Sequence, residues 1–275
     1  MRCKLLALDL DDTLLGPDRQ AGPRERRAVR AVREMGAIPV VATGRPYASA
    51  SLIAQQLETE SPVISNSGAL VHDSDGTILR ELRLDRDLCL EVLRTATTGD
   101  LTIYVYTSAA TLTNREHELT LRYSSILQVP ISQERCLEDQ LRSSKFHVHA
   151  LGLRVDADDA GDLERELEAT FKGEAWILRS VPTLVEILPP GASKGSALEF
   201  LCDHLDIPVQ DTAAIGDGLG DMDMLQVAGC GILVANADEQ LHDQVDMVTD
   251  QPHTDGVMEA IEHLFPGFVD HGRNR

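Results

Sequence analysis

The sequence predicts an α/β fold, a doubly wound parallel sheet that is interrupted by a smaller, inserted α+β domain. Short apolar runs alternate with amphipathic stretches up to residue 83 and again from residue 189, as in consecutive βαβ units. Residues 84–188 contain helical and strand-like stretches without that regular alternation, which indicates a separate module. We therefore expect one domain from residues 1–83 and 189–275, and a second domain from residues 84–188.

Strands and helices alternate in the first part of the chain. Pro23 near the start and Gly36 after the end delimit an amphipathic stretch, as is typical of a helix. Asp75-Gly76 between two short apolar runs indicates a hairpin turn. The expected strands are residues 4–8, 38–42, 63–65, 70–72 and 77–82, and the expected helices are residues 24–35 and 47–57.

The rest of the chain divides at Pro189-Pro190-Gly191, where the alternation returns. Residues 115–141 are polar without a clear period, so no element is assigned there. Before the break we expect helices 85–97 and 159–171 and strands 101–106, 146–155, 175–178 and 184–188. After the break we expect helices 196–205, 221–227, 238–245 and 256–264 and strands 212–215 and 231–234.

The charge balance argues against several classes of partner. The 275 residues include 25 Lys and Arg against 45 Asp and Glu, which gives a net charge of −20. A protein that binds duplex nucleic acid or an anionic membrane usually has the opposite balance, so we expect neither partner. The five cysteines are scattered without zinc spacing, which indicates reduced thiols, and no stretch reaches a membrane-spanning length. These features predict a cytoplasmic protein.

Carboxylates follow directly on the first predicted strand. Asp9 and Asp11 are two residues apart, so both can reach one small volume at the strand end. Ligands in open α/β sheets bind at the carboxyl ends of strands, and carboxylates beside a core are costly unless something compensates for them. The alternative is a plain turn, since Asp is common in turns and at helix N-termini.

Thr43 and Lys194 lie at the ends of other predicted elements. The hydroxyl of Thr43 can donate to a phosphoryl oxygen, although Thr-Gly is also an ordinary strand-to-helix turn. Lys194 opens a helix, where a cation opposes the macrodipole, and an anion held by the ammonium and the helix end together would explain it. A solvated surface lysine is the alternative for Lys194.

A glycine-rich turn after strand 212–215 contains Asp217 and Asp221. Carboxylate oxygens at a strand end suit Mg²⁺, which prefers carboxylates together with water and substrate phosphate. Asp221 can at the same time be the N-cap of the following helix. Asp223 is expected on that helix, facing solvent.

Together these segments resemble the haloacid dehalogenase-like (HAD) phosphohydrolases, in the Cof-type or IIB subgroup with a large α/β cap. The resemblance implies a Rossmann-like HAD core with residues 84–188 as an inserted α+β cap. The segments that carry it are Asp9-x-Asp11-x-Thr13, Thr43-Gly44-Arg45-Pro46, Lys194-Gly195 and Gly216-Asp217-x-x-x-Asp221.

The resemblance also implies roles for these residues. Asp9 would attack phosphorus, and Asp11 would be the general acid and base. Thr43 and Lys194 would stabilise the phosphoryl group as catalytic and phosphate-binding residues. Further phosphate- or substrate-binding residues would be Leu10, Gly44 and Asn236, and the ligands of Mg²⁺ would be Asp9, Asp11, Asp217 and Asp221.

Three positions depart from the subgroup's usual pattern. Gly218 and Gly220 stand where the last motif usually has asparagine. Ser67 stands where the subgroup commonly has the asparagine of an Asn-Gly-Ala turn. The departures concern the fine placement of the site and leave its carboxylates in place.

The predicted function is a Mg²⁺-dependent phosphomonoesterase that hydrolyses small phosphorylated metabolites, sugar phosphates first, through an aspartyl-phosphate. The partner would be a small-molecule phosphate ester, and the protein a monomer or homodimer. Candidates for substrate contacts in the cap strands are Tyr104, Tyr106, His147, His149 and Glu186.

Two alternatives remain open. A non-enzymatic, metabolite-binding regulator is favoured by the two glycines in the last motif. A phosphomutase would need cations in the cap for a second phosphate, and the cap has Arg115, Arg122, Arg142, Arg154 and Arg179.

Overall fold

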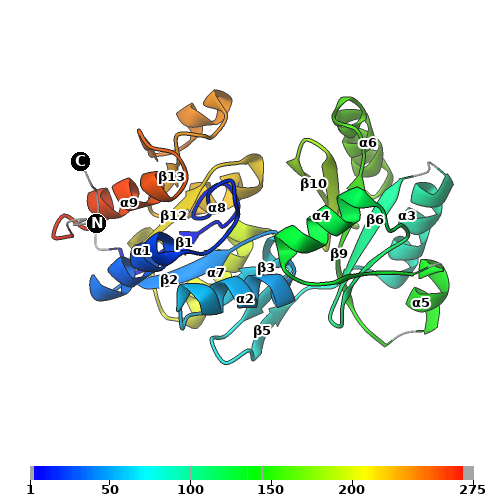
Figure 1. Ribbon diagram of the computed structural model, residues 1–275, viewed down its shortest axis with the longest axis horizontal. Coiled ribbons are helices and arrows are strands. Elements are labelled where there is room, and N and C mark those ends of the chain that lie inside the picture. The colour runs from blue at the N-terminus through cyan, green and yellow to red at the C-terminus, as the bar shows by residue number, and fades with distance from the viewer. Residues whose placement is uncertain (1–2, 99–100, 135, 144, 269–275) are drawn as a thin grey trace.

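The computed structural model describes residues 3–98, 101–134, 136–143 and 145–268, and these residues form two β-sheets (Figure 1). The larger sheet has the strand order β14-β13-β12-β1-β2-β3-β4-β5. Neighbouring strands are parallel from β14 to β3, and β4 and β5 extend the sheet in antiparallel orientation. In sheet order the strands are Met247–Val248, Gly231–Leu233, Thr212–Gly216, Leu5–Leu8, Ile38–Ala42, Val63–Ser65, Leu70–His72 and Ile78–Glu81.

Helices cover both faces of this sheet, because its central strands are apolar on both sides. In β1, Leu6 and Leu8 pack in one core cluster, and Leu5 and Ala7 pack in another. The helices of the first cluster are α1 (Pro23–Glu34), α2 (Tyr47–Leu57) and α9 (His253–Leu264), and those of the second are α7 (Lys194–His204) and α8 (Met222–Val227). The predicted doubly wound α/β fold is confirmed. None of the helices in the described ranges is long and apolar enough to cross a membrane.

The smaller sheet is built from residues 102–188 and has the order β10-β11-β9-β6-β7-β8. All its neighbouring strands are antiparallel except β7 and β8. In sheet order the strands are Trp176–Val181, Leu184–Leu188, Val148–Arg154, Thr102–Thr107, Thr111–Thr113 and Ile131–Gln133. The helices of this part are α3 (Arg86–Thr98), α4 (Glu118–Leu127), α5 (Leu137–Ser143) and α6 (Ala157–Thr170). We call residues 84–188 the inserted segment; its boundaries at 84 and 188 stay predictions.

The two faces of the smaller sheet have different neighbours. Ile103 and Val105 of β6 pack in an apolar cluster with α3, α5 and α6. Tyr104 and Tyr106 project from the opposite face of β6 and pack with Ala69 and Ala192, which lie outside the inserted segment. This second face is therefore the one turned toward the larger sheet.

Several elements differ from the sequence-based predictions. The unassigned stretch 115–141 contains α4, β8 and α5, and neither β7 nor β14 was predicted. Residues 238–245, predicted as a helix, form a short 3-10 helix, because the Asp238 side chain binds the N–H of Gln240 and Leu241 is the one buried residue of the turn. The four 3-10 helices of the described chain are Asn66–Gly68 (η1), Val209–Asp211 (η2), Leu219–Asp221 (η3) and Glu239–Gln244 (η4).

A carboxylate joins the two parts of the chain near their connection. Glu81 ends β5, and its Oε1 lies 2.9 Å from Nδ1 of His147 and 2.9 Å from Nε2 of His149. Burial would raise the pKa of Glu81, but hydrogen bonds from Arg83 and from both histidines lower it to about 2. The two imidazoles, predicted as candidates for substrate contacts, are thus occupied in holding the inserted segment to the larger sheet.

His72 of β4 lies close to this contact and stacks on Tyr47, with the ring centroids 3.4 Å apart. Burial and the neighbouring His149 lower the pKa of His72 to about 4, although Glu81 acts in the opposite direction. The unfolded chain takes up this proton near pH 6.5, whereas the folded chain resists it. Protonation of the unfolded state therefore destabilises the fold as the pH falls.

We expect acidification from pH 7 to pH 5 to lower the free energy of unfolding by about 2 kcal/mol through His72 alone. His72→Phe keeps a stacked ring without the titrating group, so its free energy of unfolding should fall by about that much less over the same interval. Urea unfolding of both proteins at the two pH values measures the difference. An equal decrease in the two proteins would show that His72 is not the responsible group.

Candidate active site

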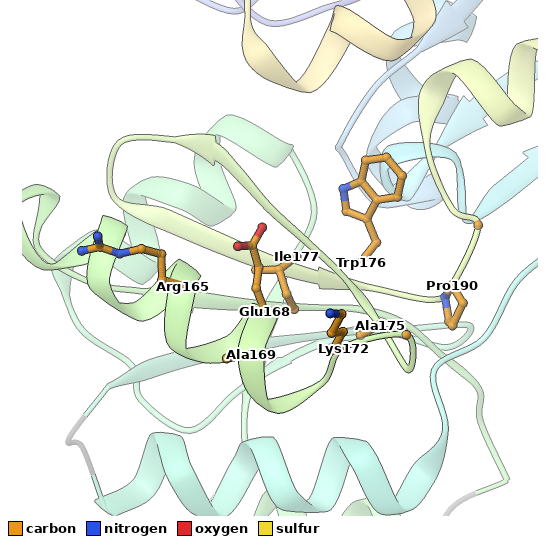
Figure 2. A pocket seen from close by; sticks show the side chains of 10 residues that line it. Arg165, Glu168, Ala169, Lys172, Ala175, Trp176, Ile177 and Pro190 are labelled. Carbon is orange, nitrogen blue, oxygen red and sulfur yellow. The ribbon is translucent and has the colours of Figure 1, made fainter.

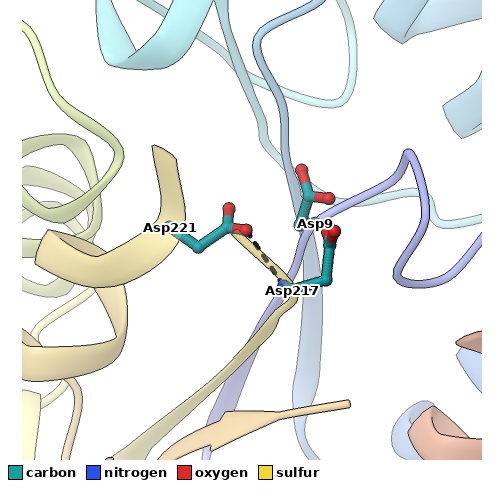
Figure 3. A group of neighbouring side chains, drawn as sticks. All are labelled: Asp9, Asp217 and Asp221. Atoms are coloured by element: carbon teal, nitrogen blue, oxygen red, sulfur yellow. Dashed lines mark hydrogen bonds between the residues drawn. The ribbon is translucent and has the colours of Figure 1, made fainter. Parts of the chain in front are cut away.

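The carboxyl ends of three neighbouring strands form the centre of the candidate site. β1 lies between β12 and β2, so Asp9, Asp217 and Thr43, which follow these strands, come to one edge of the sheet. Carboxylate oxygens of Asp9, Asp217 and Asp221 all lie within 4.8 Å of one another. Figure 3 shows Asp9 and Asp217 side by side, with the carboxylate of Asp221 directed toward them from η3.

Lys194 joins two of these carboxylates. Its Nζ lies 2.6 Å from Oδ1 of Asp9 and 2.6 Å from Oδ1 of Asp221, and all three side chains are buried. Ser193 caps α7 by accepting a hydrogen bond from the N–H of Ser196, which makes Lys194 the first helical residue. Burial alone would lower the pKa of Lys194, but the charges of Asp221 and Asp9 raise it above its usual value. Lys194 is a fixed internal charge and not a solvated surface residue.

Asp221 also determines the shape of the turn before η3. Its Oδ2 accepts hydrogen bonds from the N–H groups of Asp217 and Gly218, each at 3.1 Å. Gly216 leaves room for this side chain, since a Cβ at Gly216 would lie 2.5 Å from the Cβ of Asp221. Both oxygens of Asp221 therefore have partners within the protein, and the residue holds Lys194 and orients Asp217.

When ionised, the three carboxylates have more negative charge than the single ammonium of Lys194 neutralises. Burial, followed by the nearby Asp221, raises the pKa of Asp217 to about 7 and the pKa of Asp9 well above its usual value. A second cation would relieve this charge, and carboxylate oxygens suit a hard divalent ion such as Mg²⁺. Asp9 and Asp217 each keep one oxygen that accepts no hydrogen bond within the described residues, so this donor set fits the ion.

Thr13 and Arg45 are site residues to which sequence reasoning gave no role. The hydroxyl of Thr13 donates to Oδ1 of Asp217 at 2.7 Å. The guanidinium of Arg45, which is 3% exposed, donates from Nε to Oδ2 of Asp11 at 2.7 Å and from Nη2 to Oδ1 at 2.6 Å. Both residues lie within the motifs that carry the resemblance, and this position is the feature of the sequence that could have indicated their roles. The carboxylate of Asp11 is thus held apart from the cluster of Asp9 and Asp217.

Two of the predicted phosphate-binding residues lie around these groups. The buried Thr43 accepts a hydrogen bond at Oγ1 from the N–H of Arg45 at 3.2 Å. Gly44 lies close to Ser67, whose Oγ would be 3.2 Å from a Cβ at Gly44. The side chain of Leu10 is in the hydrophobic core, so Leu10 can offer a phosphate only its backbone.

Asn236 supports the loop after Asp11 from outside. Its Nδ2 donates to the carbonyl of Asp12 at 2.8 Å, and its Oδ1 accepts from the N–H of His253 at 3.0 Å. The side chain is exposed and is not hydrogen-bonded to Asp9 or Lys194. A substrate contact by Asn236 stays a prediction.

The prediction that Asp223 faces solvent is wrong. Its Oδ2 accepts a hydrogen bond from the N–H of Gly195 at 2.9 Å. The N-terminal N–H groups of a helix need partners, and an acidic side chain is favourable there. Asp223 therefore joins α8 to the end of α7 that presents Lys194.

Comparison with known families agrees with this geometry. A family model described as haloacid dehalogenase-like hydrolase matches residues 6–261. The chain belongs to this HAD family. The family places the chain among enzymes, and the relatives that it resembles are phosphatases.

The similarity to HAD relatives extends over nearly the whole chain. The chain is 29% identical over 283 residues to the phosphatase YwpJ of Bacillus subtilis, which covers 95% of this chain and 99% of that protein. It is 28% identical over 272 residues to the HMP-PP phosphatase of Cronobacter sakazakii, which covers 98% and 96%. A solved haloacid dehalogenase-like hydrolase from Bacteroides thetaiotaomicron has a TM-score of 0.84 and 27% identity and covers 96% of this chain and 100% of its own. A HAD subclass IIB sugar phosphatase, with a TM-score of 0.81 and 19% identity, supports the fold.

The glycines in the last HAD motif leave its carboxylates in place. The N–H of Gly218 binds Asp221, and a Cβ at Gly218 would have no atom within 4 Å. A Cβ at Gly220 would have Cδ2 of Leu178, in the inserted segment, as its neighbour at 4.0 Å. Asp221 orders the turn through backbone N–H groups, so the amide side chains that usually occupy positions 218 and 220 are not needed for this order.

Gly68 in η1 fixes the residue before Lys194 from outside the helix. Gly68 has φ +90°, and a Cβ there would lie 2.0 Å from the carbonyl oxygen of Ser193. Gly173 has a similar φ of +83°, but a Cβ there would meet no atom within 4 Å. Alanine at position 173 therefore tests the cost of the positive φ without a collision.

We expect Gly173→Ala to lower the free energy of unfolding by about 1 kcal/mol and to leave turnover unchanged. Gly68→Ala adds the collision with Ser193, so it should cost at least about 2 kcal/mol more and reduce turnover about 10- to 100-fold by moving Lys194. Urea unfolding and phosphate release measure the two effects. Equal losses in both variants would contradict the packing role of Gly68.

Proposed function

We propose that this HAD phosphatase is a Mg²⁺-dependent phosphomonoesterase that transfers the phosphoryl group first to Asp9 and then to water. The observation that carries the proposal is the buried ammonium of Lys194, 2.6 Å from Asp9. A carboxylate can attack phosphorus and form a covalent intermediate, but the approach of two anions needs nearby positive charge. Lys194 supplies such a charge at the nucleophile itself.

Asp9 and Asp217 would hold Mg²⁺, with Asp221 and the backbone carbonyl of Asp11 as the further ligands that we predicted. When bound, the ion would offset the negative charge of the cluster and polarise a phosphoryl oxygen. In this arrangement Asp221 acts mainly through its hydrogen bonds to Lys194 and to the turn.

In the first step an oxygen of Asp9 bonds to phosphorus while the bond from phosphorus to the ester oxygen breaks. Asp11 gives its proton to that leaving oxygen. Asp11 then takes a proton from water, whose oxygen bonds to phosphorus while the bond from phosphorus to Asp9 breaks, and inorganic phosphate leaves. Thr43, Lys194 and the N–H groups of Leu10 and Gly44 would stabilise charge on the phosphoryl oxygens.

The ion pair of Asp11 and Arg45 sets a condition on these proton transfers. Arg45 donates one hydrogen bond to each oxygen of Asp11, so the proton that Asp11 exchanges would use a lone pair that Arg45 leaves free or replace one of these bonds. We propose that the inserted segment works as a cap over residues 1–83 and 189–275. Substrate bound beneath such a cap would compete for Arg45 and exclude water from the reaction.

The contacts of two of the five cap arginines do not favour the phosphomutase alternative. Nη2 of Arg142 lies 3.9 Å from Oε2 of Glu138, and Nε of Arg179 lies 3.4 Å from Oε2 of Glu164. Both arginines thus pair with carboxylates within the inserted segment, which would compete with binding of a second phosphate. An intact cluster of carboxylates around Lys194 likewise favours catalysis over a purely regulatory role.

The proposed substrates are small phosphorylated metabolites. Sugar phosphates are the first group to assay, and HMP-PP, which gives the Cronobacter relative its name, is the second. We propose a cytoplasmic monomer or homodimer, in keeping with an acidic protein that acts on soluble phosphate esters.

Asp9→Asn should remove the nucleophile and reduce phosphate release from p-nitrophenyl phosphate by at least about 1,000-fold. Acid-quenched wild-type enzyme should contain a hydroxylamine-sensitive phosphoryl group that the variant lacks. Asp162→Asn is the matched control, since the side chain of Asp162 is 79% exposed on α6. Turnover in Asp9→Asn at the level of this control would refute the assignment of the nucleophile.

Chelation with EDTA should abolish turnover, and added Mg²⁺ should restore it, because the carboxylate cluster needs a second cation. Asp217→Asn should raise the Mg²⁺ concentration for half-maximal activity by at least about tenfold. Titration of dialysed enzyme with Mg²⁺ measures both effects. Full activity in the dialysed enzyme without added metal would exclude this part of the proposal.

A further inference from the structure

The turn directly after Asp11 contains backbone strain. Asp12 has φ +64°, a left-handed conformation that residues other than glycine rarely adopt. Two further non-glycine residues with positive φ, Arg19 at +54° and His253 at +50°, are hydrogen-bonded to Asp12. Strain of this kind costs free energy and persists where the surrounding structure fixes it, often at functional sites. Three strained residues thus meet beside the proposed general acid and base.

The carbonyl oxygen of Asp12 accepts two hydrogen bonds from distant parts of the chain. Nδ2 of Asn236, in the loop after β13, lies 2.8 Å from this oxygen, and Nδ1 of His253, the first residue of α9, lies 3.0 Å from it. The backbone N–H of His253 also donates to Oδ1 of Asn236 at 3.0 Å. Because a carbonyl oxygen only accepts, His253 carries a proton on Nδ1. We call this closed set of hydrogen bonds among Asp12, Asn236 and His253 the Asp12 clamp.

The clamp fixes the peptide plane that joins Asp12 to Thr13, and residues on both sides of Asp12 belong to the candidate site. Asp11 precedes it, and the hydroxyl of Thr13 after it donates to Oδ1 of Asp217 at 2.7 Å. The carboxylate of Asp12 is bound by Nη2 of Arg19 at 3.1 Å. A rotation of this peptide plane would therefore change the direction in which the chain leaves Asp11.

The imidazole of His253 serves the turn after Asp11 and not its own helix. The N-cap of α9 is Pro252, which makes no side-chain cap hydrogen bond. Where only the backbone requires a positive φ, glycine or asparagine is the usual residue. A histidine at φ +50° is strained, and its Nδ1 binds a carbonyl 241 positions away in the sequence. The strain at position 253 therefore accompanies a contact that holds Asp12.

We propose that His253 is a positioning residue for Asp11. Its Nδ1–H fixes the carbonyl of Asp12, and the fixed turn directs the carboxyl group of Asp11 toward the leaving oxygen. The inference rests on the proposed phosphatase function, in which Asp11 gives its proton to that oxygen. Loss of the clamp should therefore slow the reaction most for esters whose leaving oxygen needs a proton.

Two esters with different leaving groups test this role. The alkoxide of glucose 6-phosphate needs a proton to leave, whereas 2,4-dinitrophenolate leaves without one. His253→Gly removes the imidazole, and its kcat/KM should fall at least about tenfold for glucose 6-phosphate and less than about twofold for 2,4-dinitrophenyl phosphate. Urea unfolding of this variant should have a midpoint close to that of the wild type, because the relieved strain offsets the lost hydrogen bond.

His253→Asn tests whether the hydrogen bond is responsible. Nδ2 of an asparagine occupies the same place in the side chain as Nδ1 of a histidine, and asparagine tolerates a positive φ. This variant should restore kcat/KM for glucose 6-phosphate to within about threefold of the wild type. Asp206→Gly is the matched control for glycine at a positive φ, since Asp206 is exposed and has φ +54°.

A second control lies in the inserted segment. Figure 2 shows an open groove beside α6 and β10, whose lining includes Glu168, Trp176 and the exposed Lys172 but no residue of the clamp. Lys172→Ala and Asp206→Gly should both leave the ratio of the two kcat/KM values unchanged. A change in this ratio as large as that in His253→Gly would overturn the proposal.

The kinetics separate the positioning role from the phosphatase function. Hydrolysis of both esters by the wild type, with equal losses for the two in His253→Gly or without recovery in His253→Asn, would refute the positioning role alone. A wild type that hydrolyses neither ester would refute the proposed function, and the positioning role, which depends on it, would fall with it.

Discussion

The buried ammonium of Lys194 is the interaction on which the rest of the site depends. Asp9 and Asp221 come from opposite ends of the sequence, and each would be costly to bury as a separate charge. One ammonium between them makes their burial feasible and places positive charge at the proposed nucleophile. The same arrangement leaves Asp217 with a raised pKa, which is the physical reason that the cluster suits a further cation.

Placing a lysine at the first position of a helix is itself unfavourable, because the positive end of the macrodipole repels it. The structure compensates for this from several directions. Ser193 caps α7, Asp223 accepts the N–H of Gly195, and Gly68 packs against the carbonyl of Ser193. Since these residues come from different elements, the position of one ammonium is determined by the packing of a large part of the fold.

Much of this arrangement could be predicted, because it follows from local rules. Parallel strands bring their carboxyl ends to one edge of the sheet, so Asp9, Thr43 and Asp217 had to converge once the strands were identified. The contacts of Arg45 with Asp11 and of Asp223 with Gly195 depend on the direction of side chains across long sequence separations, and periodicity does not define that direction. The motifs include Arg45 but do not show that its guanidinium binds Asp11, and they do not include Asp223.

The inserted segment was harder to predict for a related reason. α4 has only Thr120 and Leu127 as buried residues, so its apolar period is too weak to recognise. Its neighbour β8 has three residues, two of them exposed, and α5 has seven residues. In the larger sheet β14 has two residues. Elements of this kind take their structure from tertiary contacts and not from their own sequence.

The turn between β12 and α8 is held by backbone hydrogen bonds and not by its own side chains at positions 218–220. Asp221 orders the turn through the N–H groups of Asp217 and Gly218, which do not depend on the side chains at positions 218–220. The carboxylates therefore keep their places when those side chains change. Leu219 and Gly220 line a cavity together with Lys194, so substitutions at these two positions alter that space and leave the contacts of Asp217 in place.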